Sequence, residues 1–417
     1  MPSQYIMVPH TIIDKGLDHC GQAMAAPSQI DKPRLKPVLA YLVTQDWYFM
    51  SHRLPMALAA QRAGYNVHVI THVEKDRDAI EALGFRLHAL DWRRGSINPL
   101  AFFANVLAVR RLYREIVPDL VHHVALQPTI VGSVASTGLQ FVRLNAVAGL
   151  GFVFTSPTLK ARLARPVFRT LLRHVFGDAR ASVLVQNPDD YAAIRALGVT
   201  EKHIFKISGS GVETDRLTPL PEPTGAMTIA FVGRLLEDKG IRTLVRAHEI
   251  LTRQGNKIQL LIAGEIDPAN PVSIPPQEIK KWSGRPGIDV LGHVADIKEV
   301  WKKAHIAVLA SRREGLPKSL LEAAACGRPI VATDVPGCRE IARPGINALL
   351  VPPDNEGALA DAIAQLSKDT TLRRKYGEAG RRIVEDEYSA DKIGAEVVAL
   401  YGHLLRRGDS EFASHLS

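Results

Sequence analysis

The stretch TPLPEPTGAMTIAFV, residues 218–232, divides the sequence into two parts of similar organisation. Three prolines within Thr218–Gly225 restrict the backbone, which is typical of a stiff, extended linker. The apolar run Thr228–Val232 follows directly and predicts a buried strand. Because 417 residues exceed one ordinary core, we interpret residues 218–225 as the linker between two domains.

Strands and helices alternate on the C-terminal side of the linker, and they predict an α/β domain over residues 226–388. Its predicted helices include Ile241–Gln254 and Pro317–Cys326. Its further predicted strands are Ile258–Ala263, Ile288–Leu291, Ile306–Leu309 and Pro329–Thr333.

The same alternation on the N-terminal side predicts a second doubly wound parallel sheet over residues 36–217. We expect a mobile tail over residues 1–35, and an amphipathic helix over residues 389–405 that crosses back to the first domain. The cleft between two such domains is the expected ligand site. The predicted strands are Val38–Val43, Val67–Thr71, Phe85–Leu90 and Leu120–His122, and the predicted helices are Leu54–Gly64, Asp76–Gly84 and Pro99–Val117.

Composition favours a globular protein of a reducing cytoplasm. Apolar residues make up 46% and charged residues 23%, and no apolar run of about 18 residues, the length that spans a bilayer, occurs. Three scattered cysteines, Cys20, Cys326 and Cys338, fit neither a disulfide framework nor a zinc site, and we interpret the last two as structural. The net charge of +9 suits an anionic partner, but no motif for nucleic acid accompanies it.

The block EGLPKSLLE, Glu314–Glu322, carries the strongest functional signal. It follows a predicted strand, and Pro317 fits the first position of a helix because its missing N–H is no loss there. The unpaired N–H groups at such a helix end favour an anion. Two carboxylates beside an anion site indicate a ligand with both phosphate and sugar hydroxyls.

A second block, GRLLEDKG over Gly233–Gly240, follows the first strand of the same domain. Gly233 permits a tight turn, Arg234 suits bidentate contact with phosphate, and Lys239 adds a point charge. Each residue alone is typical of a solvated surface. Their position at one sheet edge favours a common site.

These two blocks, with the run Gly327–Thr333, resemble retaining glycosyltransferase family four. The resemblance implies the two-domain GT-B fold and a nucleotide-diphosphate sugar as co-substrate. UDP is the expected nucleotide, with GDP as the alternative. It also implies that no metal or other cofactor is needed. By the same resemblance Arg234 and Lys239 hold the diphosphate, Glu322 the ribose and Glu314 the transferred sugar. The remaining donor-binding positions it implies are Gly233, Gly315, Leu316, Pro317 and Ser319.

Shorter blocks, among them His52–Pro55 and Gly149–Gly151, are similar to bacterial enzymes that build surface polysaccharide on undecaprenyl diphosphate. This implies a lipid-linked glycan acceptor for a hexose or N-acetylhexosamine. Many relatives place a histidine at the reacting sugar after the fourth strand. Here the usual position falls near Val124, so either His123 or His52 is expected at the sugar. For both residues the alternative is a structural histidine that is partly buried and hydrogen-bonded within the protein.

Two segments of the first domain are candidates for peripheral contact with an anionic membrane on its cytoplasmic face. Residues 158–180 interleave basic and apolar residues at helical spacing, with Pro166 expected to kink or start a helix. The second candidate combines Trp92 with Arg93–Arg94 and Phe102–Phe103. For both, packing of the apolar residues in the core is the alternative.

Two other functions remain open for the same residues. An epimerase or hydrolase of nucleotide sugars uses the same fold and the same diphosphate contacts, but it turns over without an acceptor. A transferase-like scaffold without activity would not need Arg234, Lys239, Glu314 and Glu322 together, which argues against it.

Overall fold

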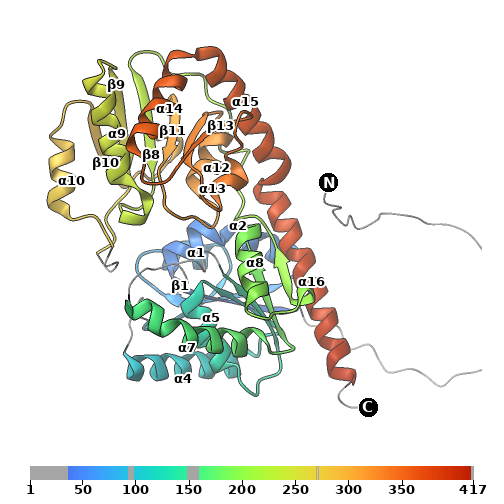
Figure 1. The fold of residues 1–417 in the computed structure, drawn as a ribbon. Coiled ribbons are helices and arrows are strands. Elements are labelled where there is room, and N and C mark those ends of the chain that lie inside the picture. Colours follow the sequence, from blue (N-terminus) through green and yellow to red (C-terminus); the bar gives the residue numbers. More distant parts are fainter. Residues whose placement is uncertain (1–35, 93–97, 148–158, 269, 271, 415–417) are drawn as a thin grey trace, which may run out of the picture. The chain divides into compact units, whose positions relative to one another are not determined.

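The computed structural model describes residues 36–92, 98–147, 159–268, 270 and 272–414. The predicted tail, Arg93–Arg94 and Gly149–Gly151 lie outside these residues. The described chain forms two parallel sheets flanked by helices, as predicted for a GT-B fold (Figure 1). We call the sheet β1–β7 with its helices the first lobe, and the sheet β8–β13 with its helices the second lobe.

The first lobe has seven parallel strands in the order β3-β2-β1-β4-β5-β6-β7. The order reverses beside β1, so the carboxyl ends of β1 and β4 form the switch point at which such sheets bind ligands. The strands are β1 (Val38–Gln45), β2 (Asn66–His72), β3 (Arg86–Ala89), β4 (Leu120–Val124), β5 (Val142–Ala146), β6 (Ala181–Val185) and β7 (Ile204–Lys206).

Helices cover both faces of the first sheet because its strands are apolar on both faces. In β1, Leu39, Tyr41 and Val43 pack in one hydrophobic cluster, whereas Ala40 and Leu42 pack in another. The helices of this lobe are α1 (Asp46–His52), α2 (Leu54–Arg62), α3 (Arg77–Ala82), α4 (Pro99–Ile116), α5 (Leu126–Ala135), α7 (Leu159–Phe176) and α8 (Pro188–Ala196), with the 3-10 turn η1 (Glu201–His203).

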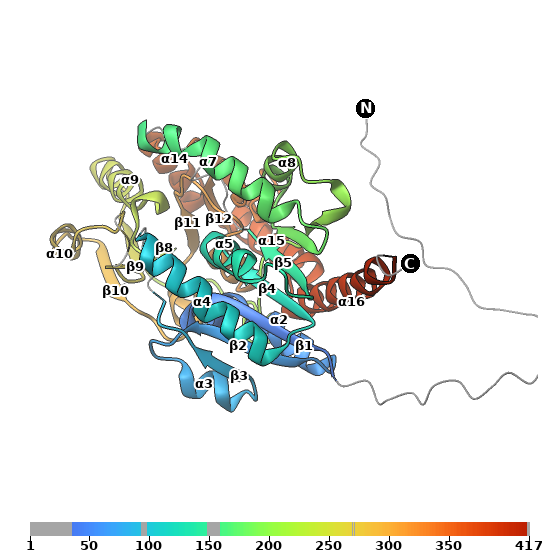
Figure 2. The ribbon, with the colours of Figure 1, turned by 90° about the horizontal axis from the view of Figure 1, so that it is seen from below.

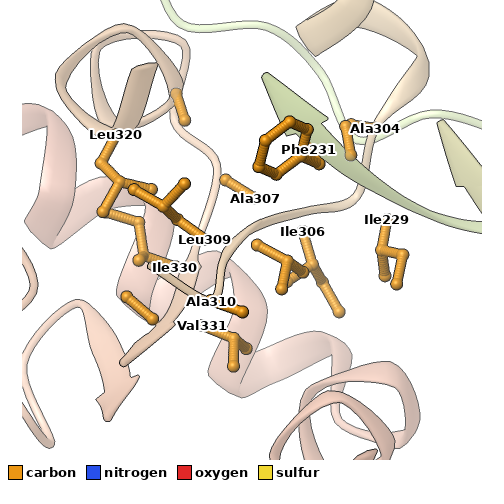
Figure 3. Packing of buried hydrophobic residues seen from close by; sticks show 14 of the residues in the cluster. Ile229, Phe231, Ala304, Ile306, Ala307, Leu309, Ala310, Leu320, Ile330 and Val331 are labelled. Atoms are coloured by element: carbon orange, nitrogen blue, oxygen red, sulfur yellow. The ribbon is translucent and has the colours of Figure 1, made fainter. Parts of the chain in front are cut away.

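The second lobe repeats the architecture with six parallel strands in the order β10-β9-β8-β11-β12-β13. Its core includes Phe231, Leu309 and Leu320 together with small residues such as Ala307 (Figure 3). The strands are β8 (Met227–Val232), β9 (Ile258–Ala263), β10 (Ile288–Gly292), β11 (Ile306–Leu309), β12 (Ile330–Thr333) and β13 (Ala348–Val351).

The helices of the second lobe follow the predicted rhythm, and residues 218–224, which precede them, form neither helix nor strand. Pro166 does not start a helix, because α7 begins at Leu159 and continues through it. The helices are η2 (Glu237–Lys239), α9 (Ile241–Arg253), α10 (Pro276–Ser283), α11 (Lys298–Lys303), α12 (Lys318–Ala325), α13 (Cys338–Ile341), α14 (Glu356–Lys368) and α15 (Thr370–Glu387).

The last helix, α16 (Ala390–Ser414), packs on α2 and the first sheet (Figure 1 and Figure 2). The hydroxyl of its buried Tyr401 lies 2.8 Å from that of Tyr41 and 2.7 Å from Nδ1 of His122. The helix is longer than the predicted 389–405, and beyond that range the guanidinium of Arg407 donates to the carbonyl of Lys202 at 3.0 Å.

Candidate active site

Lys239 and Glu314 form the centre of the site in the second lobe. Nζ of Lys239 donates to both carboxylate oxygens of Glu314, at 2.6 and 2.8 Å. The turn η2 ends at Lys239, and Gly240 then takes a left-handed conformation with φ of 66°. A Cβ at Gly240 would overlap the carbonyl oxygen of Ala310, so the chain needs glycine there to bring Lys239 to the end of β11.

The carboxylate of Glu314 is held from two sides. Its side chain is 8% exposed, and it accepts a hydrogen bond from Ser311 Oγ at 2.6 Å as well as from Lys239. Gly337, with φ of 73°, packs against the backbone of this loop, since a Cβ there would meet the carbonyl oxygens of Glu314 and Gly315. This backbone packing fixes the loop that carries Glu314.

Arg234 lies at the carboxyl end of β8, as predicted. It pairs with Asp267 at 2.8 Å, and its guanidinium lies over the ring of Trp47 from α1 at 5.9 Å from the centroid. The turn depends on Gly233, whose φ is 156°, and on Gly264, where a Cβ would overlap the Gly233 carbonyl. Arg234 keeps part of its side chain exposed, so it remains accessible to a ligand.

Helix α12 begins one residue later than predicted. Pro317 has an extended ψ of 110° and is the N-cap, so Lys318 is the first helical residue and Ser319 lies in the first turn. Glu322, in the next turn, is 12% exposed and lies 3.7 Å from the ammonium of Lys318. Burial raises the pKa of Glu322, and the charge of Lys318 opposes that shift.

His52 lies with these residues. It ends α1, its Nδ1 lies 2.6 Å from Ser51 Oγ, and its ring stacks on Tyr48 at 4.3 Å between centroids. Burial, then the charge of Lys318, lowers the pKa of His52 well below its ordinary value; Arg53, Lys239 and Arg234 act in the same direction. The ring is therefore neutral at pH 7 and faces a cluster of cations.

The structure does not bring His123 to this place. Its ring is fully buried below α5, where Nε2 lies 2.9 Å from the hydroxyl of Tyr113 and Nδ1 lies 2.7 Å from Oδ1 of Asn145. Gly132 packs so closely on the ring that a Cβ would overlap it. The packed-histidine alternative therefore describes His123, because β4 turns its side chain toward the helix layer.

Contacts between the lobes join the Glu314–Glu322 block to first-lobe residues that the motif argument did not single out. Nζ of Lys318 donates to the carbonyl of Ser51 at 2.6 Å, and Nδ2 of Asn187 donates to the carbonyl of Gly315 at 2.9 Å. Leu316 packs on Gly209 of the first lobe. The Asn-Pro start of α8 marks Asn187 as a helix cap in the sequence, but nothing there indicates its second partner.

The arrangement suits a ligand with a diphosphate and a sugar. Arg234, Lys239 and Lys318 supply positive charge beside the N-terminal end of α12, and Glu314 and Glu322 supply acceptors for hydroxyl groups.

Cys326 and Cys338 are buried free thiols, and burial raises the pKa of Cys326 to about 11, which fits a structural role. Among the helices of the described residues, none is long and apolar enough to cross a membrane.

Comparison with known proteins agrees with this chemistry. Residues 38–181 match the family model "Glycosyl transferase 4-like", and residues 226–369 match "Glycosyl transferases group 1". N,N'-diacetylbacillosaminyl-diphospho-undecaprenol alpha-1,3-N-acetylgalactosaminyltransferase of Campylobacter jejuni is 24% identical over 382 residues, 86% of this chain and 98% of that one. The capsular polysaccharide biosynthesis glycosyltransferase CapM of Staphylococcus aureus is 28% identical over 183 residues, 44% of this chain and 48% of CapM.

A solved structure shows the same fold. HepE of Anabaena, in complex with UDP and glucose, superposes with a TM-score of 0.69 at 16% identity, covering 87% of this chain and 99% of HepE. The two family models, the two parallel sheets and the paired Lys239 and Glu314 lead to one assignment. The chain belongs to the family-four glycosyltransferases of the GT-B fold.

Proposed function

We propose that this glycosyltransferase moves a hexose or N-acetylhexosamine from a UDP-sugar to a lipid-linked glycan, with retention of configuration and without a metal ion. The observation that carries the proposal is a group of three cations, Arg234, Lys239 and Lys318, whose charges all act on His52, with Lys239 paired to Glu314 and Lys318 paired to Glu322. It supplies charge for a diphosphate and acceptors for sugar hydroxyls in one place.

The diphosphate takes the cations in this proposal. Arg234 contacts two phosphate oxygens, and Lys239 exchanges part of its pairing with Glu314 for a phosphate oxygen. Protein cations then neutralise the charge that develops on the leaving diphosphate, which is the task that a divalent metal has in other transferases. Retention is proposed from the family alone, since the residue types do not fix the stereochemistry.

The sugar and ribose take the carboxylates. Glu314, held by Ser311 and Lys239, accepts from hydroxyls of the transferred sugar, and Glu322 accepts from the ribose. The neutral ring of His52, stacked on Tyr48, lies toward the reacting sugar from the first lobe. Its orientation by Ser51 keeps one ring nitrogen engaged and leaves Nε2 as the contact for substrate.

The Campylobacter relative acts, by its name, on an undecaprenol-linked sugar, which supports a lipid-linked acceptor here. A matching surface is the outer side of α4, which we call the α4 face. Its apolar members Leu100, Phe103 and Leu107 are 79%, 61% and 67% exposed, and Arg111 and Arg114 continue the same side toward the C-terminal end. An apolar stripe followed by basic residues suits an anionic lipid surface.

The structure gives different surroundings to the two segments that the sequence suggested for membrane contact. In α7, Leu172, Val175 and Phe176 are buried in the core, so packing explains its amphipathic pattern over residues 168–176. Trp92 is buried as well. Among the described members of the second candidate, Phe103 is the exposed one, and we therefore place the proposed contact with the inner face of the cell membrane on α4.

The proposal is tested with purified protein, a panel of nucleotide sugars and EDTA, with and without a membrane lipid extract. Release of UDP that requires the extract, with an α-linked product from an α-linked donor by NMR, is the expected result. Release without extract indicates a hydrolase, and conversion of the donor without extract indicates an epimerase. Strict loss of activity in EDTA that Mg²⁺ restores contradicts the metal-independent mechanism.

A further inference from the structure

A cavity of about 540 Å³ lies in the first lobe at the edge opposite to the active site. Three segments line it: the end of α5 with the turn after it, residues 133–139; the start of β5 at Arg143; and residues 173–180, which lead from α7 into β6. Strands β5 and β6 begin here, whereas the transfer site lies at carboxyl ends of strands. The length of a strand, about 15 Å for five residues, separates the two edges.

The lining is basic. Arg143, Arg173 and Arg180 line the cavity together with His174, and among the lining residues Asp178 is the one acidic group. Asp178 pairs with Arg143. Arg173 uses its Nε to reach the carbonyl of Leu197 at 2.9 Å, which leaves its terminal nitrogens for a ligand. The balance of charge therefore favours an anion.

Two buried polar groups of this lining lack a partner within the described chain. They are Nε of Arg143, a residue 7% exposed, and Oγ of Ser133, a residue 6% exposed. The same guanidinium is otherwise well held, with Nη1 donating to Ser136 Oγ at 3.0 Å. A buried donor without a partner costs free energy, so a bound water or ligand that pairs with it would be stabilising.

We propose that this cavity binds the phosphate group of a phosphate ester. Phosphate oxygens accept from Nε of Arg143, from the hydroxyl of Ser133 and from the guanidinium of Arg180, three donors on three different segments. The volume exceeds that of an inorganic ion and falls in the range of small-molecule pockets, which leaves room for the esterified group. The ester is either a soluble metabolite or a lipid headgroup, and both present the same chemistry. The site is independent of the transfer reaction.

The test uses the full chain carrying Arg234→Ala and Lys239→Ala, which removes two of the three active-site cations and so reduces phosphate binding there. Equilibrium dialysis with labelled inorganic phosphate measures the affinity of the cavity for free phosphate. Co-sedimentation with phosphatidylcholine vesicles, with and without phosphatidic acid, measures whether the protein binds a phosphate headgroup in a membrane. Arg180→Gln is expected to weaken binding about tenfold or more because it removes a charge-assisted donor. Ser133→Ala is expected to weaken it about threefold and, being a helix-favouring change, to leave the fold intact.

Arg374→Gln, an exposed arginine of α15, is the matched control and should leave binding unchanged. Loss of phosphate binding in both cavity variants with no effect on vesicles identifies a soluble ester. Loss of binding to phosphatidic acid vesicles in both variants identifies a headgroup. Binding that is equal in the parent protein, Arg180→Gln and Ser133→Ala overturns the proposal, as does a parent protein that binds neither probe.

Discussion

The ammonium of Lys239 lies 2.6 Å from one carboxylate oxygen of Glu314 and 2.8 Å from the other, although 75 residues separate them in the sequence. The pair joins the end of β8 to the end of β11, neighbouring strands of the sheet. Both charges are largely shielded from water, so each depends on the other. A diphosphate that binds Lys239 must share it with Glu314, which ties the position of the carboxylate to the occupancy of the site.

Lys239→Ala and Glu322→Ala should each lower the rate of sugar transfer by at least about 100-fold, because each removes a group that we propose to contact the donor. Lys257→Ala, an exposed lysine of the same lobe, is the matched control and should keep full activity. Circular dichroism and thermal unfolding show whether the variants are folded. Full transfer by either folded variant would remove that residue from the site.

Gly337→Ala should cost more stability than Gly345→Ala, although both glycines have nearly the same φ, 73° and 74°. A Cβ at Gly345 meets nothing within 4 Å, so this variant bears only the backbone cost of about 1–2 kcal/mol. A Cβ at Gly337 meets the carbonyls of Glu314 and Gly315. Chemical denaturation and transfer assays should show a larger loss of both stability and activity for Gly337→Ala; equal losses contradict the packing argument.

The free energy of unfolding should fall as the pH falls from about 6.5 to about 4, partly because of His123. Burial lowers the pKa of His123 to about 4 in the folded chain, whereas an unfolded histidine titrates near 6.5. The folded state thus favours the neutral ring, and its contribution, roughly 3 kcal/mol, is present above pH 6.5 and lost as the pH falls. His123→Gln should flatten this slope in urea titrations at several pH values, whereas His293→Gln on the surface should not.

Phe103→Ser and Leu107→Ser should each reduce binding to vesicles that contain phosphatidylglycerol, because they remove exposed apolar area from the α4 face. The control is Ile346→Ser, an apolar residue of the second lobe that is 51% exposed. Co-sedimentation at low and high salt separates the apolar contribution from that of Arg111 and Arg114. Unchanged sedimentation of both α4 variants would move the membrane contact elsewhere.

Much of the fold could be predicted from the sequence, since buried parallel strands leave continuous apolar runs. The runs at Val38–Val43 and Thr228–Val232 identify β1 and β8, which each lie next to the point where their sheet reverses its strand order. The sequence pattern did not predict the exact ends of the helices. Pro317 fits a helix start by its missing N–H, but its extended ψ makes it the cap.

The active site divides along the same line. Spacing within one block correctly placed Glu314 in the loop before α12 and Glu322 within that helix, because a loop and the helix after it are local structure. Local pattern does not determine which face of a strand a side chain takes at the end of a sheet. His123 therefore turned to the α5 layer, and His52, at the end of α1, lies among the cations. Asn187 and Lys318 acquire their partners only from the other lobe.

By itself the sequence determined two doubly wound sheets, their linker and the family-four motifs, because apolar periodicity and turn glycines act over a few residues. Only the tertiary structure decided that Lys239 pairs with Glu314 and that the cavity beside Arg143 keeps two polar groups without partners. Those contacts join segments that are distant in sequence. Their geometry depends on how whole strands and helices pack, which no local pattern of residues encodes.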